Sequence, residues 1–200
     1  CKPLTHDFVN NVMRICREKN ILLVVDECQT GLGRTGKRFA FEHYDIVPDI
    51  LVLGKALGGG MPLGAFITSK ATMDNLTHNP VLGHITTFGG HPVCCAAGMA
   101  AFIQLTEQKL YDSVEEKEIL FRKLLKHPKI KSVAGKGLLL SIELESEKVC
   151  LNTIRKCIEN GLFTDWFLFA PNCLRIAPPL TISHQLIERS CEILLNALND

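Results

Sequence analysis

The strongest constraint on the fold is a short apolar run, Ile50–Leu53, that leads into a lysine and a glycine-rich loop. The run is too short and too uniformly apolar for an amphipathic helix, so it predicts a strand covered on both faces, as in a parallel α/β sheet. Lys55 then follows the carboxyl end of this strand, the edge at which ligands of open α/β sheets bind. Gly58–Gly60 allow the backbone to approach a ligand closely.

Lys55 fits two interpretations. A lysine that follows a strand is most commonly a solvated charge. Enclosed by Leu53, Ala56 and Leu57, however, its amine would be desolvated, which lowers the pKa of a lysine and makes it a nucleophile. Taken alone, the run leaves both interpretations open.

A second apolar run, Ile21–Val25, predicts another buried strand, and it is followed directly by Asp26. A connection of 28 residues separates Asp26 from Lys55, which is long enough for one right-handed crossover between parallel strands. We therefore expect the two side chains at one edge of the sheet. Pyridoxal phosphate needs such a pair, because a lysine bonds its aldehyde and a carboxylate against the ring nitrogen keeps the ring protonated.

Two residues that follow Asp26 suit the same cofactor. Residues i and i+2 of a strand face the same way, so we expect Cys28 beside Asp26, packed on the face of the ring. Gln29 is then placed to donate a hydrogen bond to the phenolic oxygen of the ring. The sequence thus predicts cofactor-binding roles for Asp26, Cys28, Gln29 and Lys55.

Three stretches carry a resemblance to a known family. They are V-V-D-E-C-Q-T-G-L-G-R-T-G-K at 24–37, P-D-I-L-V-L-G-K-A-L-G-G-G-M-P-L-G-A at 48–65 and T-T-F-G-G-H-P at 86–92. In order and spacing they resemble the cofactor motifs of the class III aminotransferases, the group that contains ornithine, acetylornithine and 4-aminobutyrate transaminases. The resemblance extends over nearly the whole chain. It implies a transaminase that uses pyridoxal phosphate to move an amino group from an amino acid to an oxo acid such as 2-oxoglutarate.

The resemblance also implies roles for individual residues. It makes Lys55 and Asp26 the catalytic pair. It has Thr87 reach across the interface of a homodimer with shared active sites to the phosphate of the neighbouring cofactor, although a threonine that caps a turn is the commoner case. Arg175 lies in an apolar run, L-R-I-A-P-P-L, where a structural ion pair is the default, and the resemblance gives it a substrate carboxylate to bind.

The sequence departs from the family pattern at two positions. Cys28 stands where the family usually has a branched aliphatic residue, and a thiol there makes the site sensitive to oxidation. His91 stands where the family usually has asparagine, and it is given no catalytic role. The basic loop 31–38 is interpreted as a solvated loop supported by Arg34 rather than as a phosphate site, and Asp165–Trp166 is placed near the substrate pocket without a defined role.

The expected fold class is α/β. Residues 1–110 are assigned to the second half of the large domain of a fold-type I enzyme, with a mostly parallel sheet and helices on both faces, and residues 111–200 to a small α+β domain. The expected helices are Thr5–Asn20, Phe39–Tyr44, Lys70–Leu76, Val93–Leu105, Asp112–Leu125, Cys150–Asn160 and His184–Leu198. The further expected strands are Pro62–Thr68, Leu138–Leu144, Phe167–Phe169 and Leu174–Ile176, the last two joined by a turn at Pro171–Asn172.

By resemblance, the loop that cradles the cofactor phosphate and the aromatic residue that stacks on the ring precede Cys1. We therefore expect the chain to begin inside a longer protein. On its own it carries about half of a cofactor site, so weak or absent binding of pyridoxal phosphate is expected for these 200 residues alone.

Composition and charge narrow the possible partners, the compartment and the metal content of the protein. The formal net charge of +1 favours neither nucleic acid nor an acidic membrane surface, and no run is long enough to span a membrane. Nine cysteines without a C-x-x-C pair indicate a reducing cytoplasm. No metal is expected, because the seven histidines lack ligand spacing.

Several alternatives stay open. Aminomutases, decarboxylases and racemases share the same motifs, and a non-catalytic relative would act as a binding module. A nucleotide-binding protein is excluded because Gly54–Lys55 lacks the glycine loop that precedes such a lysine and the Ser or Thr that follows it. Ornithine, acetylornithine, 4-aminobutyrate, lysine and β-alanine all remain possible amino donors.

Overall fold

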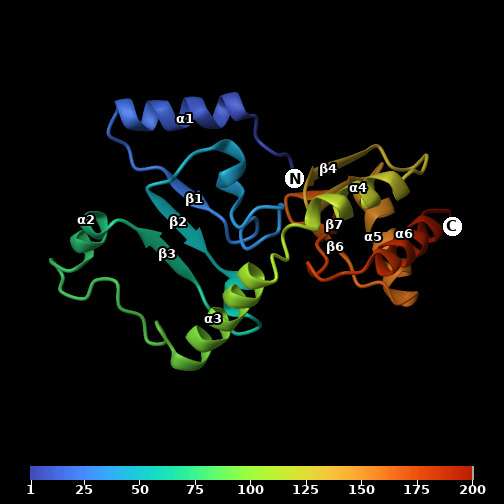
Figure 1. The fold of residues 1–200 in the computed structure, drawn as a ribbon. Helices are drawn as coiled ribbons and strands as arrows, with labels where there is room; N and C mark the ends of the chain where they lie inside the picture. Colours follow the sequence, from blue (N-terminus) through green and yellow to red (C-terminus); the bar gives the residue numbers. More distant parts are fainter. Residues whose placement is uncertain (200) are drawn as a thin grey trace. The chain divides into compact units, whose positions relative to one another are not determined.

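The computed structural model describes residues 1–199, which form two compact units (Figure 1). The N-terminal unit comprises Leu4–Gly33 and Lys37–Lys109. The C-terminal unit begins at Leu110 and also includes two short segments from earlier in the chain, Cys1–Pro3 and Arg34–Gly36. The class is α/β, as the sequence predicts.

A three-stranded sheet forms the centre of the N-terminal unit, in the order β1 (Val24–Asp26), β2 (Ile50–Leu53) and β3 (Ala65–Thr68). β1 and β2 are parallel, whereas β2 and β3 are antiparallel, so this part of the sheet is mixed rather than mostly parallel. The reason is the length of the β2–β3 connection, residues 54–64, which is shorter than the dozen or so residues that a parallel crossover needs.

Helices of this unit follow the expected positions with shifted ends. They are α1 (His6–Glu18), α2 (Lys70–Met73) and α3 (Pro92–Glu107), with short 3-10 turns η1 (Ala40–Tyr44), η2 (Lys55–Gly58) and η3 (Asp74–Leu76). Thr5, at the start of the helix expected over Thr5–Asn20, caps α1, because its hydroxyl accepts a hydrogen bond from the backbone N–H of Phe8 at 3.3 Å.

Burial in this unit is lower than the sequence predicts. The strand expected over Ile21–Val25 begins only at Val24, and the side chains of Ile21 and Val24 are each 53% exposed. β1 is an edge of the described sheet, so nothing within residues 1–199 pairs with its free side. α3 is rich in small and apolar residues, yet only Cys94, Gly98 and Leu105 of this helix are buried.

The C-terminal unit contains a four-stranded antiparallel sheet in the order β4-β5-β7-β6. Its elements are α4 (Val114–Leu124), β4 (Ser132–Lys136), β5 (Leu139–Glu143), α5 (Glu147–Glu159), β6 (Asp165–Phe167), β7 (Ala170–Ile176) and α6 (His184–Asn199). The three helices and β5 confirm the predicted elements, whereas β4 was not predicted.

The turn predicted at Pro171–Asn172 is wrong. The β6–β7 hairpin turns at Leu168–Phe169, and Pro171 lies inside β7. A proline is tolerated there because β7 pairs with β5 only from Cys173 onward, so its missing N–H removes no bond from that ladder.

Alternation along β5 and β7 separates two faces of this sheet. Leu140, Ile142 and Leu174 are fully buried in the main apolar core, which also contains residues of α4, α5 and α6. Because side chains alternate across a strand, Ser141 and Arg175 lie on the other face, directly opposite each other in the register. The fold thus places Arg175 away from the apolar core.

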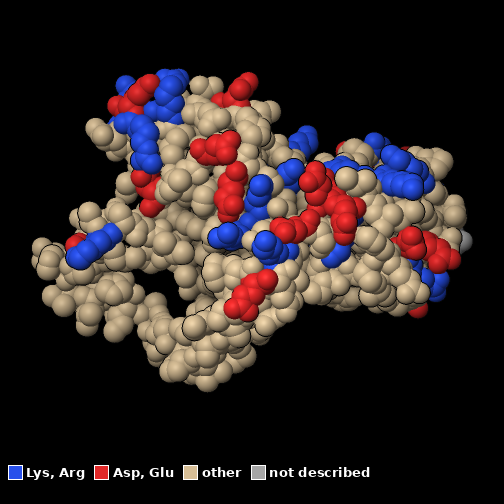
Figure 2. Space-filling view, in the orientation of Figure 1, with Lys and Arg blue, Asp and Glu red and all other residues tan. Residues whose placement is uncertain are grey.

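The face drawn in Figure 2 shows no single-sign charge field. In Figure 2, basic and acidic side chains are interspersed on the visible face, in keeping with the net charge of +1. Within residues 1–199, no helix has both the length and the apolar character needed to cross a membrane.

Candidate functional site

The ends of β1 and β2 bring two of the predicted residues to one edge of the N-terminal sheet. Asp26 ends β1 opposite Val52, and the backbone N–H of Glu27 donates to the Val52 carbonyl at 2.8 Å, which extends the parallel ladder by one bond. β1 and β2 run in the same direction (Figure 1), and Lys55 follows β2 after one glycine, so it lies at the same edge. Lys55 is also close enough to Asp26 for its positive charge to act on that carboxylate.

Lys55 begins the 3-10 turn η2 in an unusual backbone conformation. Its φ of +47° lies in the left-handed region, which costs a residue with a side chain about 1–2 kcal/mol. Such strain is found most often at functional sites. The predicted apolar enclosure of this lysine is wrong for the described residues, since Lys55 and Ala56 are both exposed.

Asp26 is held as a carboxylate. The backbone N–H of Cys28 donates to its Oδ1 at 2.9 Å. Hydrogen bonds from the backbone and the side chain of Cys28 lower the pKa of Asp26, and the charge of Lys55 lowers it further. A group whose pKa is already below its ordinary value stays ionised at neutral pH, as a carboxylate facing a protonated ring nitrogen must.

Cys28 is half-buried beside this carboxylate. The hydrogen bond to Asp26, followed by burial, raises the pKa of its thiol, which is therefore protonated and able to donate. Gln29 follows it as an exposed residue of the same turn. Asp26, Cys28, Gln29 and Lys55 thus lie in two adjacent chain segments at one edge of the sheet.

Thr87 lies in the segment between η3 and α3, where it is exposed. No hydrogen bond within residues 1–199 joins it to Asp26 or Lys55. Its neighbour Thr86 forms a turn in which the backbone N–H of Gly89 donates to the Thr86 carbonyl at 3.3 Å. A Cβ on Gly89 would lie 2.5 Å from the Thr86 hydroxyl, so a side chain there requires the exposed Thr86 side chain to rotate.

Arg175 is part of the C-terminal unit and is already paired. Asp165 lies directly opposite it on β6, and its Oδ1 accepts a hydrogen bond from Arg175 Nε at 2.7 Å. Nη2 bonds the second carboxylate oxygen, so the pair is bidentate. Both side chains remain about a third exposed, at 32% and 37%. The structural ion pair expected for an arginine in an apolar run is therefore present. Its partner is Asp165, which the sequence alone did not identify.

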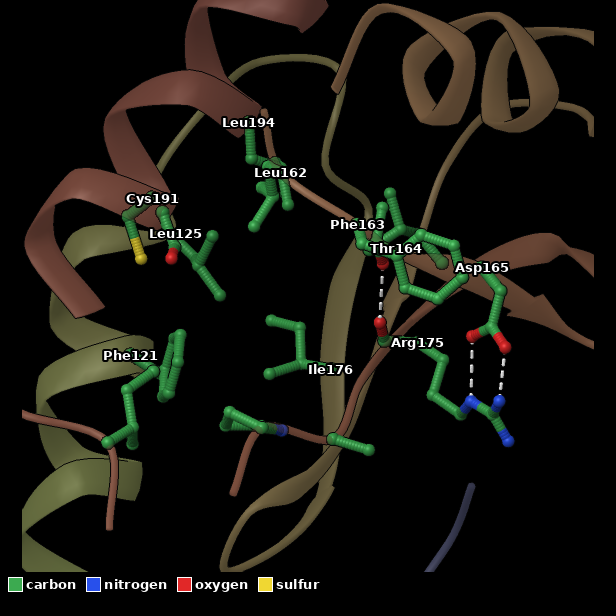
Figure 3. A pocket seen from close by; sticks show the side chains of 15 residues that line it. Phe121, Leu125, Leu162, Phe163, Thr164, Asp165, Arg175, Ile176, Cys191 and Leu194 are labelled. Carbon is green, nitrogen blue, oxygen red and sulfur yellow. Dashed lines mark hydrogen bonds and ion pairs between the residues drawn. The ribbon is translucent and has the colours of Figure 1, made fainter. Parts of the chain in front are cut away.

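A cavity of about 190 Å³ lies next to this pair in the C-terminal unit. Figure 3 shows that Phe121, Ile176 and Leu194 point into it, whereas the guanidinium of Arg175 points away from them toward Asp165. Asp165 and Arg175 also line the cavity, so the charged pair forms one part of an otherwise largely apolar wall.

Comparison with known proteins identifies the family. The family model described as "Aminotransferase class-III" matches residues 2–198. The chain belongs to the class III aminotransferase family.

Among similar curated members of this family are the acetylornithine aminotransferases of Caldanaerobacter subterraneus subsp. tengcongensis, 38% identical over 201 residues, and of Aquifex aeolicus, 37% identical over 194 residues. These matches cover 98% and 97% of this chain but 49% of each relative. The chain thus spans about half the length of the curated class III aminotransferases that it matches.

Solved structures of class III aminotransferases share the fold. The ornithine aminotransferase of Toxoplasma gondii matches with a TM-score of 0.87 at 34% identity, over 96% of this chain and 46% of that one. The acetylornithine aminotransferase of Elizabethkingia anophelis matches with a TM-score of 0.87 at 36% identity, over 98% of this chain and 50% of that one. The likeness to fold-type I aminotransferases confirms the predicted fold class.

One residue of this class III chain that the sequence analysis gave no role is Glu27. It is 2% exposed, and its two carboxylate oxygens accept hydrogen bonds from the backbone N–H groups of Ala40 and Phe41, each at 2.7 Å. Burial raises the pKa of Glu27. The available sequence signal was a carboxylate near the end of a predicted strand. In the structure, Glu27 holds the Asp26 turn against η1.

We expect Glu27→Gln to lower the free energy of unfolding of the complete protein by about 1–3 kcal/mol, because an amide offers only one acceptor oxygen and leaves a buried donor unpaired. Denaturant unfolding followed by circular dichroism measures the change. The matched control is Glu18→Gln on exposed α1, where the change is expected to stay within about 0.5 kcal/mol. Equal losses in the two variants would contradict the proposed anchoring by Glu27.

Proposed function

We propose that the protein of which this chain forms part is a transaminase that uses pyridoxal phosphate to move an amino group from an amino acid to an oxo acid such as 2-oxoglutarate. The observation that carries the proposal is the juxtaposition of an ionised Asp26 and the amine of Lys55 at the ends of two adjacent parallel strands. The relatives named acetylornithine and ornithine aminotransferases support an ω-amino or acetylornithine-like donor.

The residues present fit the cofactor. They supply a primary amine for its aldehyde, a carboxylate kept ionised by two hydrogen bonds for its ring nitrogen, and a thiol and an amide within the next three residues. The Toxoplasma relative is described with partial occupancy of pyridoxal phosphate at its active site. In our proposal Asp26, Cys28, Gln29 and Lys55 hold the cofactor in this chain.

Bound pyridoxal phosphate supplies an aldehyde that receives the amino group and a protonated ring that withdraws electrons from the substrate carbon. Asp26 keeps the proton on the ring nitrogen by accepting a hydrogen bond from it. Lys55 would hold the cofactor through its amine, and its Nζ, when free, would take the proton from the carbon that bears the substrate nitrogen. Because donor and acceptor use the same groups in turn, the kinetics are ping-pong.

We assign Arg175 to the substrate carboxylate. Its partial exposure and its position on the polar face of β7 support this role. Asp165 already accepts two of its hydrogen bonds, so a substrate carboxylate has to share the guanidinium with Asp165 or displace it. The division of the chain at Leu110 supports assigning residues 1–110 to the large domain and 111–200 to the small one.

We further propose a homodimer in which Thr87 contacts the phosphate of the neighbouring cofactor. Residues 75–106 contain no Asp, Glu, Lys or Arg, and Figure 2 shows an uncharged surface over this part of the N-terminal unit. Its exposed apolar side chains include Val81, Ile85, Phe88, Val93 and Met99. An apolar surface of this kind is typical of a protein interface.

For the complete protein we expect Phe88→Asp to raise the dissociation constant of the dimer by about thirtyfold or more, because a buried charge replaces an aromatic contact. Sedimentation equilibrium measures it. Phe163→Asp, which changes a phenylalanine of the C-terminal unit that is likewise largely exposed, is the control and is expected to leave the dimer intact. Unchanged dimerisation in the Phe88 variant would place the interface elsewhere.

Free thiols at all nine cysteines support a reducing compartment, and we propose the cytoplasm. The proposal includes no nucleic-acid, membrane or metal partner.

A product assay on the complete protein tests the proposed reaction. With an ω-amino donor such as ornithine or acetylornithine, we expect multiple turnovers only when 2-oxoglutarate is present, and one amino group transferred per site when it is absent. Turnover that does not need an oxo acid would identify an aminomutase, decarboxylase or racemase instead. No product from any donor would favour a non-catalytic binding module.

A further inference from the structure

We propose that Asp165 is a specificity-determining residue, which makes the site at Arg175 select a zwitterionic head group rather than a lone carboxylate. Such a head group is the α-ammonium and α-carboxylate of a diamino acid. The inference rests on the proposed function, in which Arg175 binds the substrate carboxylate. It gives Asp165 a second role beyond its ion pair, which is to accept a hydrogen bond from the α-ammonium group of the same substrate.

The geometry of the ion pair leaves one edge of the guanidinium available. Asp165 lies opposite Arg175 in the register of β6 and β7, and it engages the edge formed by Nε and Nη2. Within residues 1–199 no hydrogen bond engages Nη1, and Figure 3 shows this nitrogen pointing away from Asp165. The edge formed by Nη1 and Nη2 is a second bidentate site of the same fork. A substrate carboxylate can therefore bind there without displacing Asp165.

The surroundings of Arg175 place Asp165 next to such a ligand. Arg175 lies between Ser141 of β5 and Asp165 of β6 in the register, so the three side chains form a row across the polar face of the sheet. Ser141 is 3% exposed, whereas the side chains of Arg175 and Asp165 are 32% and 37% exposed. The row is therefore closed at its Ser141 end and open to a ligand at its Asp165 end.

The charges at this position favour a zwitterion. A substrate carboxylate on the free edge shares Nη2 with Asp165, and one guanidinium charge offsets only one of the two carboxylates, which repel each other. An ammonium group on the carbon next to the substrate carboxylate removes this imbalance. Each oxygen of Asp165 accepts one bond from Arg175 and retains a lone pair for that ammonium group. A neutral amide or a methylene in its place leaves the two carboxylates uncompensated.

The test compares two donors of the complete protein with 2-oxoglutarate as acceptor. They are ornithine and 5-aminopentanoate, which is ornithine without its α-ammonium group. For the unsubstituted protein we expect a KM for ornithine at least about tenfold below that for 5-aminopentanoate, the effect of one hydrogen bond between charged groups. Asp165→Asn is expected to raise the KM for ornithine by about tenfold without raising that for 5-aminopentanoate, and to leave kcat within about twofold for both.

Two results of this comparison would overturn the proposal. One is an equal change in the KM of both donors in Asp165→Asn, because the loss of the ion pair then acts through Arg175 alone. The other is a KM for 5-aminopentanoate equal to or below that for ornithine in the unsubstituted protein. Because 5-aminopentanoate still needs a folded site, its retained turnover in Asp165→Asn shows that the variant is folded.

The matched control is Glu192→Gln. It removes a carboxylate that pairs with Arg189 on the surface of α6, in the same unit of the chain. We expect this variant to retain the preference for ornithine over 5-aminopentanoate. A comparable loss of preference in Glu192→Gln would overturn the assignment to Asp165, since the effect would then not depend on the position of the carboxylate.

Binding without turnover separates this inference from the proposed function. Norvaline and pentanoate correspond to ornithine and 5-aminopentanoate without the distal amine. In an NMR titration of the complete protein without cofactor, we expect norvaline to bind at least about tenfold more tightly than pentanoate, and Asp165→Asn to bind the two alike. Equal affinities in the unsubstituted protein would overturn the role of Asp165. Absence of transamination with every donor would instead refute the proposed function, while this titration would still decide whether Asp165 recognises the ammonium group.

Discussion

Lys55→Ala in the complete protein is expected to reduce transaminase turnover by at least about four powers of ten, because the variant lacks the amine that bonds the aldehyde and moves the proton. Turnover with an ω-amino donor and 2-oxoglutarate measures the loss. The backbone at Lys55 is strained, with a φ of +47° in a residue that is not glycine. Because the surrounding turn imposes this conformation, alanine is expected to remove the amine and to leave the backbone as it is.

Borohydride reduction followed by peptide mass mapping identifies the lysine directly. After pyridoxal phosphate is added, we expect a pyridoxyl mass on the Lys55 peptide that disappears in Lys55→Ala. The control is Lys70→Ala, which removes an exposed lysine of α2 that pairs only with Asp74 among the residues described, and it is expected to leave both the adduct and the turnover unchanged. An adduct on another lysine would contradict the assignment.

Asp26→Asn is expected to reduce turnover by about a thousandfold or more, because an amide cannot hold the proton on the ring nitrogen and the ring then withdraws electrons poorly. The pKa of Asp26 is lowered, so its carboxylate form is present above the ordinary value of 3.8 and is lost only as the pH falls through the lowered value. Protonation of Asp26 should therefore not limit activity between about pH 5 and 8.

The matched control for this variant is Asp49→Asn. Asp49 precedes β2, where its carboxylate accepts hydrogen bonds from Arg17 and from the backbone N–H of Leu23. We expect this variant to lose stability but to keep its turnover number, because Asp49 lies at the opposite end of the strand from Lys55. Near-normal activity of Asp26→Asn would show that another residue faces the ring nitrogen.

The parts of the site that were predictable from sequence are those set by local chain chemistry. A short apolar run followed by Asp26 and another followed by a glycine and Lys55 define two strand ends, and parallel pairing brings them to one edge. Thr5 as a helix cap is local in the same way, because the cap and the N–H that it binds are three residues apart.

Contacts between distant segments were not predictable in this way. Asp165 faces Arg175 only because the β6–β7 hairpin turns at Leu168–Phe169, and a turn placed at Pro171–Asn172 gives a different register. Likewise, a carboxylate after β1 gives no indication that its partners are the N–H groups of a 3-10 turn thirteen and fourteen residues further on. The burial of the N-terminal unit was overestimated for a related reason. An apolar run indicates that a strand has to be covered, but it does not indicate which segment covers it.

The C-terminal unit is not a continuous piece of the chain. Arg34 Nη1 donates to the carbonyls of Leu138 and Pro178, and a Cβ on Gly137 would lie 2.5 Å from the Arg34 carbonyl. A fragment that starts at Leu110 therefore lacks Arg34–Gly36, the three residues that pack against the turn between β4 and β5. Truncation or limited proteolysis at Leu110 therefore removes part of the unit that it is meant to isolate, because Arg34–Gly36 belong to the C-terminal unit but lie far upstream in the chain.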